Sequence, residues 1–413
     1  MKVNLTYGFI LIFCILCSEM NGQEESKLKS PNLKIEAEVV QDKQIHAISE
    51  NSDQIASQNT IHSGVSQEES EVFKPKGKFG FFLIGGYAFG LDENTNGGGN
   101  YIPADSDESS NDFYIKYARV NGSYQITPKI KGNLLLNLAD FKSADVSRKV
   151  LEIASVTYAH NKALNLRVGQ YRPYFGVENT YGIGNHLSNA WSNTYSLMGK
   201  SNWQSFQIGA SLYGDLSEEN IPVKYYLNVY NGNGKNRIAD NDSNKNISSR
   251  LVLTAIPGVE VAANYAIAKH LDENVNAAAF DFKTHHDFSS AWAFNSEFSY
   301  AFGHNLGEAI GMKVPRNELD NYKFRSWYFT PELVYALNSS NLKSVRFSCR
   351  YESMYNNLDN KNLRTIITPM LSFDIADNFR SSVVAIIDKY DKENATQGLM
   401  DTQWMQLQLQ FNY

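Results

Sequence analysis

The last eight residues of the chain alternate strictly between polar and apolar side chains. Leu407, Leu409, Phe411 and Tyr413 fall on one face of an extended segment, and amides occupy the positions between them. A repeat of two predicts a β-strand with two different surroundings. In a soluble sandwich the polar face usually carries charge, because it meets bulk water. Uncharged amides opposite a continuous apolar face are typical of a barrel strand between lipid and a wet interior.

The same alternation recurs far from the C-terminus. In LNLRVGQ, Leu164, Leu166 and Val168 lie opposite Asn165 and Arg167. A basic residue on the lipid-facing side of such a barrel costs ~2–4 kcal/mol at the membrane midplane, so Arg167 is expected to point inward. The same argument predicts further inward basic residues: Lys131, Lys224, Arg250, Arg346 and Arg350. Inward acidic residues are also expected: Glu260, Asp281, Glu297, Glu332 and Glu352.

Sixteen segments of this kind are expected, an even number, as single-chain bacterial barrels require. They are 78–91, 112–126, 130–142, 149–160, 163–172, 203–214, 221–232, 246–256, 259–270, 274–285, 289–303, 323–337, 342–356, 362–375, 379–390 and 402–413. Short turns alternate with mostly longer loops, of which 173–202 is the longest. Short turns at one rim and longer loops at the other are typical of outer-membrane barrels. The predicted fold class is therefore all-β, a transmembrane antiparallel β-barrel of about 16 strands.

Two features of these strands remain open in the sequence. Lys116 and Arg119 fall on opposite faces of a regular strand, so either a β-bulge lies between them or one of them lies at a rim. Aromatic residues near strand ends are expected to form interfacial girdles. They are Tyr87, Trp203, Trp327, Trp404 and Tyr413.

The N-terminus predicts export and a separate leader. Lys2 precedes an apolar run over 7–17, which is the pattern of a secretory signal peptide covering 1–22. This run is shorter than the ~18–20 residues that a membrane-spanning helix needs. Residues 23–75 are polar, with 5 basic and 10 acidic residues, and are expected to form a periplasmic leader that is disordered or a short coiled coil. The expected barrel, 76–413, is nearly neutral, which gives no support to nucleic-acid binding.

Four stretches of the expected barrel resemble the phosphate-selective porin O/P-type family of Gram-negative bacteria. They are DFYIKYARVNGSYQITPKIKGNLLLNLADF (112–141), LNLRVGQYRPYFGVEN (164–179), YYLNVYNGNGKN (225–236) and SSRLVLTAIPG (248–258). The resemblance covers 112–258 well and 259–413 more loosely. It implies a sixteen-stranded trimeric outer-membrane porin whose third long loop folds into the lumen. The segment 173–202 matches that loop by position and length.

The chain departs from this family in its expected lumen charges. The resemblance implies a pore lined by many arginines and lysines, whereas the inward charges expected here are of both signs. We therefore expect passive diffusion of small hydrophilic solutes or ions, with phosphate or other anions among the candidates. Arg167 and Arg172 are the expected anion contacts at the constriction, because fixed charges act most strongly where a pore is narrow. The loop aromatics Tyr174, Tyr181, Trp191 and Tyr195 either stack on a solute or pack the loop to the wall.

Two other classes of protein remain open: an exported soluble all-β binding protein, and a β-barrel hydrolase of the outer membrane. No local motif predicts catalytic residues, a metal site or a cofactor. NGNGKN (231–236) lacks the spacing of a phosphate-binding loop, and His285 with His286 has no partner at ligand spacing. After removal of the signal peptide, Cys349 is the one cysteine left, and we expect it to be a small apolar filler.

Overall fold

The structure is a computed structural model that describes residues 73–413, except 104–107, 142–149, 189, 238–239, 241–242 and 338–340. The predicted signal peptide and most of the predicted leader lie outside the described residues.

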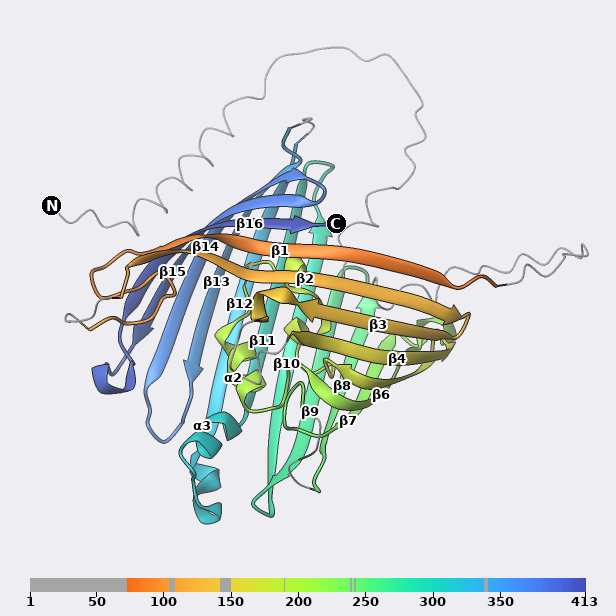
Figure 1. The fold of residues 1–413 in the computed structure, drawn as a ribbon, viewed down its shortest axis with the longest axis horizontal. Coiled ribbons are helices and arrows are strands. Elements are labelled where there is room, and N and C mark those ends of the chain that lie inside the picture. Colours follow the sequence, from red (N-terminus) through yellow and green to blue (C-terminus); the bar gives the residue numbers. More distant parts are fainter. Residues whose placement is uncertain are drawn as a thin grey trace, which may run out of the picture. The chain divides into compact units, whose positions relative to one another are not determined.

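Within the described residues, sixteen antiparallel strands pair in sequence order, and β1 also pairs with β16, so the sheet closes on itself (Figure 1). The strands are β1 (Lys76–Gly90), β2 (Asn111–Thr127), β3 (Ile130–Asn137), β4 (Leu151–Asn161), β5 (Leu164–Tyr171), β6 (Gln207–Asp215), β7 (Val223–Tyr230), β8 (Asn246–Ile256), β9 (Val259–His270), β10 (Glu273–Asp287), β11 (Trp292–His304), β12 (Lys323–Ala336), β13 (Ser344–Tyr355), β14 (Leu363–Ala376), β15 (Phe379–Tyr390) and β16 (Thr402–Asn412). The predicted fold class and each predicted strand are confirmed.

Two strand boundaries differ from the prediction by several residues. Strand β3 ends at Asn137 instead of 142, because a 3₁₀ turn over Leu138–Asp140 follows it directly. Strand β6 begins at Gln207 instead of 203. The residues before it still belong to an internal segment, in which Ser205 has a φ of 70°, outside the range of a regular β-strand.

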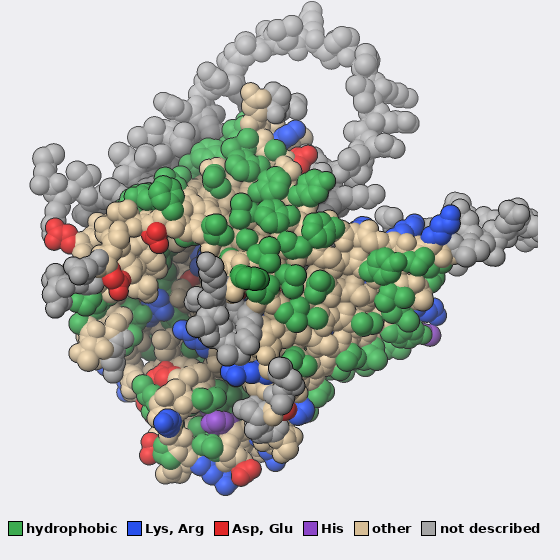
Figure 2. Space-filling view, viewed as in Figure 1, with side chains coloured by type: hydrophobic (Ala, Val, Ile, Leu, Met, Phe, Trp, Pro, Cys, Tyr) green, Lys and Arg blue, Asp and Glu red, His purple; other side chains and the backbone are tan. Residues whose placement is uncertain are grey.

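The two faces of β16 explain the alternation of amide and apolar side chains in this strand. Leu409 is 50% exposed on the outer surface, whereas Gln408 is 2% exposed inside the barrel. Strand β16 pairs with β1 on one side and with β15 on the other, so it closes the sheet. Figure 2 shows hydrophobic side chains gathered over the outer surface of this part of the barrel. The amides on the other face lie in the interior, where polar groups need partners.

A β-bulge resolves the ambiguity at Lys116. Ile84 pairs with Tyr117 and Gly85 pairs with Ile115, so Lys116 is the extra residue of the bulge. A bulge of this kind shifts the alternation by one position. Lys116 and Arg119 can therefore both reach the interior, and the charge of Lys116 acts on His186 inside the barrel.

The girdle prediction is wrong for two of the five aromatic residues. Trp203 is fully buried inside the barrel, where its indole N–H donates to the carbonyl oxygen of His304 at 2.9 Å. Trp404 packs against a hydrophobic cluster in the interior. An aromatic residue near a strand end can face either side of the barrel. These two side chains face inward and pack against the hydrophobic cluster in the interior.

Among the described residues, two α-helices lie in loops: α2 (Asn193–Lys200), inside the barrel, and α3 (Leu306–Gly311), which follows β11 (Figure 1). None of the helices in the described part of the chain combines the length and the apolar character needed to cross a membrane.

Closure of the barrel requires a residue without a Cβ at Gly86, where β1 lies close to β16. A Cβ at this position would overlap the carbonyl oxygen of Leu407, whereas a Cβ at Gly122 of β2 would meet nothing within 4 Å. We expect Gly86→Ala to force β1 and β16 apart and to destabilise the barrel by ~1–3 kcal/mol. Gly122→Ala should change stability by less than ~0.5 kcal/mol. The measurement is the temperature at which the folded form, followed by its gel mobility, is lost; equal midpoints for the two variants would contradict this.

Candidate functional site

The segment 172–206, which joins β5 to β6, runs into the barrel instead of covering its rim. It contains short 3₁₀ turns at Val177–Thr180 and Ile183–Asn185, followed by α2. The side chain of Ser192 caps the first turn of α2 by accepting the backbone N–H of Tyr195 at 2.9 Å. Gly176 has a φ of 76°, a conformation that other residues rarely adopt, and allows the chain to turn after β5. We call 172–206 the internal loop.

Hydrogen bonds attach the internal loop to widely separated strands. The backbone N–H of Gly176 donates to Asn264 Oδ1 of β9 at 2.8 Å. Gln410 Nε2 of β16 donates to the carbonyl oxygen of Gly184 at 3.2 Å. Trp191 Nε1 donates to the hydroxyl of Tyr117 of β2 at 2.8 Å. Since these strands are distributed around the barrel, the internal loop crosses its interior.

Arg350 of β13 holds the second half of the internal loop. Its guanidinium donates to the hydroxyl of Ser188 at 2.5 Å and to the carbonyl oxygens of Ala190 and Trp191 at 2.7 and 3.2 Å. Glu352, on the same face of β13, forms an ion pair with Arg350 at 2.8 Å. The Glu352 carboxylate also accepts the backbone N–H of Asn193 at 2.6 Å, at the start of α2.

Glu297 of β11 anchors the first half of the internal loop. Its carboxylate accepts the hydroxyl of Tyr181 from the loop and, at 2.6 Å, the hydroxyl of Tyr328 from β12. All three side chains are buried. A buried carboxylate needs such donors, because an unsatisfied charge in the interior is costly. Tyr181 therefore packs the loop to the barrel wall. The sequence had left open whether it has this role or stacks on a solute.

Apolar side chains complete the attachment. Phe175, Leu197, Met198 and Trp203 of the internal loop are buried in one cluster with apolar residues from the walls of the barrel. The wall residues are Ala266, Ala268, Val275, Ala277, Ala279, Ala301, Phe324, Met354, Ile366, Met370, Val384 and Ile386. Several are alanines, and small wall residues leave room for the loop. The internal loop is thus packed like a domain core and fixed in position.

Glu178 and His186 form a buried pair within the internal loop. They are 4% and 2% exposed, and His186 Nδ1 lies 3.3 Å from Glu178 Oε1. Burial raises the pKa of Glu178 to about 7, against the opposing effects of the Arg350 charge and of hydrogen bonds from Ser192. Burial also lowers the pKa of His186 well below its usual range. Below pH 7 the contact therefore joins a carboxylic acid and a neutral imidazole, and is not an ion pair.

Ser192, His186 and Glu178 are the residue types of a hydrolase triad, but their geometry differs from one. In a triad the serine hydroxyl bonds to the histidine, and the acid orients the other imidazole nitrogen. Here the Ser192 hydroxyl bonds to the Glu178 carboxyl group instead. His186 Nε2 has no hydrogen-bond partner among the described residues. All three side chains are buried, so a substrate has no access to the hydroxyl.

Basic and aromatic side chains meet where the internal loop leaves β5. The Arg172 guanidinium lies 5.4 Å from the ring centre of Trp191 and 5.7 Å from that of Phe206. Trp191 stacks on Tyr195 with 4.1 Å between the ring centres. Among the described residues, no carboxylate forms an ion pair with Arg172 or with Lys116. Arg172 therefore brings a positive charge to Trp191, and the charge of Lys116 acts on His186, whose ring contacts Trp191.

Arg167 lies inside the barrel, as its strand pattern predicts, but is only 7% exposed. Its guanidinium lies over the rings of Tyr213, Tyr174 and Tyr171, at 4.9, 5.4 and 5.8 Å from their centres. It also donates to the Tyr213 hydroxyl at 3.2 Å. Tyr174 in turn makes an edge contact with Tyr226. The aromatic rings thus enclose Arg167, and it is less accessible to a passing solute than we expected.

The remaining predicted lumen residues are mostly paired with carboxylates. Arg250 pairs with Asp281, Lys224 with Glu260 at 3.2 Å, and Arg346 with Asp374 at 2.6 Å and with Glu332 at 3.2 Å. Lys131, Lys224 and Arg346 each lie near the strand end that follows a short turn, away from the internal loop. Arg250 lies beside the loop, since it donates to the same Asn264 oxygen that holds Gly176.

The sequence reasoning missed Glu152, Lys235 and Tyr117 near the internal loop and left the direction of Arg119 open. Arg119 forms an ion pair with Glu152 at 2.7 Å, and Lys235 lies 3.9 Å from the same carboxylate. Lys235 comes from the loop after β7, where no periodic signal marks a side chain as inward. Tyr117 contacts Trp191 because of the bulge at Lys116. In the part of the chain that the structure describes, no group of three or more His, Cys, Asp or Glu side chains could hold a metal ion.

No family model matches the chain, and no curated protein matches its sequence. Solved structures do match its fold. OmpF of Salmonella typhi, solved in complex with daunomycin, aligns with a TM-score of 0.58 at 10% identity, over 82% of this chain and 97% of that one. The outer membrane channel DcaP of Acinetobacter baumannii aligns with a TM-score of 0.54 at 11% identity, over 82% and 97% of the two chains.

The anion-selective porin from Comamonas acidovorans aligns with a TM-score of 0.51 at 7% identity, over 82% of this chain and all of that one. At these identities the likeness establishes a porin-type fold for the chain. The finer resemblance to the phosphate-selective family has no matching family model and stays a prediction.

The Glu178–His186 pair predicts a pH dependence that a single variant can isolate. A carboxyl group whose pKa is raised by folding contributes stability that is full below its ordinary pKa and is lost as the pH rises through about 7. Glu178→Gln removes this titration. The unfolding free energy of the natural protein minus that of Glu178→Gln should therefore fall by up to ~3 kcal/mol between pH 4.5 and 7.

This difference is measured by denaturant titration at several pH values. The comparison also removes the opposing contribution of His186, whose lowered pKa favours folding at higher pH in both proteins. Glu218→Gln, at an exposed carboxylate in a short turn, serves as the control and should show a constant difference. A constant difference for Glu178→Gln as well would argue against the neutral pair.

Proposed function

We propose that this protein is an outer-membrane porin, a water-filled channel through which small hydrophilic solutes and ions diffuse passively. The observation that carries the proposal is a closed barrel with an apolar outer surface and a loop packed across its polar interior. A barrel without free edges satisfies its backbone groups in lipid. A soluble all-β protein would not expose so many leucines, valines and aromatic residues on the outside of its sheet.

The proposed orientation follows from the loops and the N-terminus. Short turns face the periplasm and longer loops face outward in outer-membrane barrels. Strand β1 begins, and β16 ends, at the rim of the short turns. In this orientation we expect the predicted leader, 23–75, to lie in the periplasm after removal of the predicted signal peptide, 1–22. The proposed partners are the lipid bilayer and two further copies of the chain in a homotrimer.

Weak selectivity is the best-supported transport property. Most inward charges are neutralised by close partners, as in the pairs of Arg250, Arg346 and Arg350. A cation paired with a carboxylate contributes little field to the channel. Lys116 and Arg172 have no such partner among the described residues. Arg172 lies near Trp191 of the internal loop, and the charge of Lys116 acts on His186 of the same loop. We therefore expect small neutral or weakly charged solutes to pass, with a modest preference for anions over cations.

Single-channel recording tests both the channel and its selectivity. The purified protein should conduct in a planar bilayer, and the reversal potential in a KCl gradient should show a modest anion preference. Lys116→Gln with Arg172→Gln should lower the anion-to-cation permeability ratio about two- to fivefold, since a unit charge ~4 Å from a passing ion is worth ~1 kcal/mol in water.

Lys129→Gln, which removes one positive charge at an exposed turn, is the control and should leave the ratio unchanged. Absence of conductance from correctly folded protein would refute the porin proposal. Strong anion selectivity that Arg167→Ala abolishes would instead favour a phosphate-type channel over weak selectivity.

A further inference from the structure

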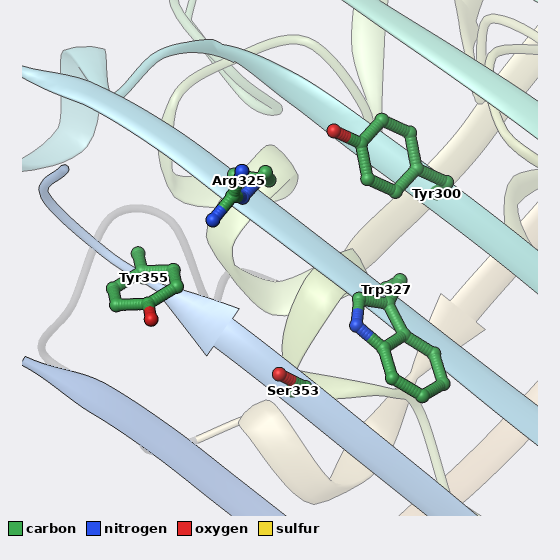
Figure 3. A pocket seen from close by; sticks show the side chains of 5 residues that line it. All are labelled: Tyr300, Arg325, Trp327, Ser353 and Tyr355. Atoms are coloured by element: carbon green, nitrogen blue, oxygen red, sulfur yellow. The ribbon is translucent and has the colours of Figure 1, made fainter. Parts of the chain in front are cut away.

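A small pocket lies on the outer surface of the barrel, on the opposite side of the barrel wall from the internal loop. Its volume is about 180 Å³, and it is lined by Tyr300 of β11, Arg325 and Trp327 of β12, and Ser353 and Tyr355 of β13 (Figure 3). We call it the outer pocket.

The strand alternation fixes the direction of the outer pocket. Ser326, between Arg325 and Trp327, contacts the Thr194 hydroxyl of the internal loop at 2.6 Å and therefore points inward. Its neighbours on β12 point outward for that reason. Met354, between Ser353 and Tyr355, belongs to the hydrophobic cluster inside the barrel. The outer pocket consequently opens on the surface that faces the surroundings of the barrel.

The outer pocket lies where an apolar surface gives way to a polar rim. Arg325 is the third residue of β12 after the loop that contains α3, so it lies near the rim of the longer loops. Trp327 pairs with Tyr300 on β11 and with Ser353 on β13. Two positions closer to the middle of the strands, the next row of outward-facing residues is wholly apolar or aromatic. It consists of Phe298, Phe329, Tyr351, Ile367 and Ile387.

Arg325 is an exposed cation without a carboxylate partner among the described residues. Its guanidinium lies 5.3 Å from the ring centre of Tyr355. Two other basic residues near the same rim are paired: Arg316 with Glu273 at 2.6 Å, and Lys323 with Asp320 at 2.7 Å. A cation–π contact of this kind leaves the N–H groups of the guanidinium available to an acceptor.

We propose that the outer pocket binds the phosphorylated headgroup of a lipid in the outward-facing leaflet of the membrane. The inference rests on the proposed function, because it requires the barrel to span a membrane. An arginine can donate two parallel hydrogen bonds to one phosphate. Trp327, Tyr300 and Tyr355 provide the amphipathic rings that prefer the headgroup level of a bilayer. The apolar row beneath them lies against the acyl chains of the same lipid.

Charge and position favour a phosphorylated lipid over two other occupants, a second copy of the chain and a free phosphate ion. A second copy of the chain would have to present a carboxylate or an apolar surface to this strand face, whereas a bilayer supplies phosphate at this level around the whole barrel. A free phosphate ion would gain nothing from the apolar row below the pocket. A phosphorylated lipid matches both the cation and the apolar surface.

The test uses native mass spectrometry of the full detergent-solubilised protein. The probes are a bisphosphorylated lipid A and the same lipid with its phosphates removed. We expect the natural protein to retain the phosphorylated lipid preferentially, and Arg325→Gln to lower its retention about fivefold, as expected for one basic residue at a membrane surface. Arg325→Lys, which keeps the charge but not the planar fork, should retain an intermediate amount.

Arg316→Gln is the matched control, because it removes an exposed guanidinium that the protein itself neutralises, and should change nothing. Equal retention by Arg325→Gln and the natural protein, or equal binding of both lipids, would overturn the proposal. A change in oligomeric state without a change in lipid retention would assign the pocket to an interface between copies. Conductance of the same samples separates the outcomes, since a conducting channel without selective lipid retention refutes this inference alone.

Discussion

Closure of the sheet between β1 and β16 is the constraint on which the rest of the structure depends. An open sheet would leave two rows of unpaired backbone groups, and these are costly wherever water is absent. Closure also divides every strand into an inner and an outer face, so each side chain must suit one of two surroundings. The glutamines of β16 and the leucines beside them follow from that division. Gly86 marks how closely the two strands approach at the point of closure.

The interior is shaped by a loop that is anchored as firmly as a core element. Arg350 and Glu352 bind backbone groups of the internal loop from β13, while Glu297 binds it through Tyr181. Charged residues on the inner face of the barrel thus serve as structural anchors. The charges of Arg350 and Glu352 largely cancel in their ion pair, which connects the way the loop is held to the weak selectivity proposed for the channel.

The outward-facing residues of β11 to β13 change in polarity along the strands. Along β11 to β13 the outward residues change from apolar near the strand centre to aromatic, and then to Arg325 near the rim. This order follows the polarity change of a membrane from its acyl chains to its headgroups. The barrel therefore has two distinct polar settings, one inside around the internal loop and one outside at the level proposed for lipid headgroups.

The sixteen strands, their order and the face of most side chains could be predicted from the sequence, because alternation is a local property that each strand carries in its own residues. The length of the connection after β5 also marked it as unusual. The contacts of the inward residues could not be predicted in this way. The bulge at Lys116, the burial of Trp203, the enclosure of Arg167 by three tyrosines and the pairing of Glu178 with His186 depend on segments that meet through folding. The alternation of side chains along a strand predicts which way each side chain points. Its partner across the barrel is set by packing between distant parts of the chain.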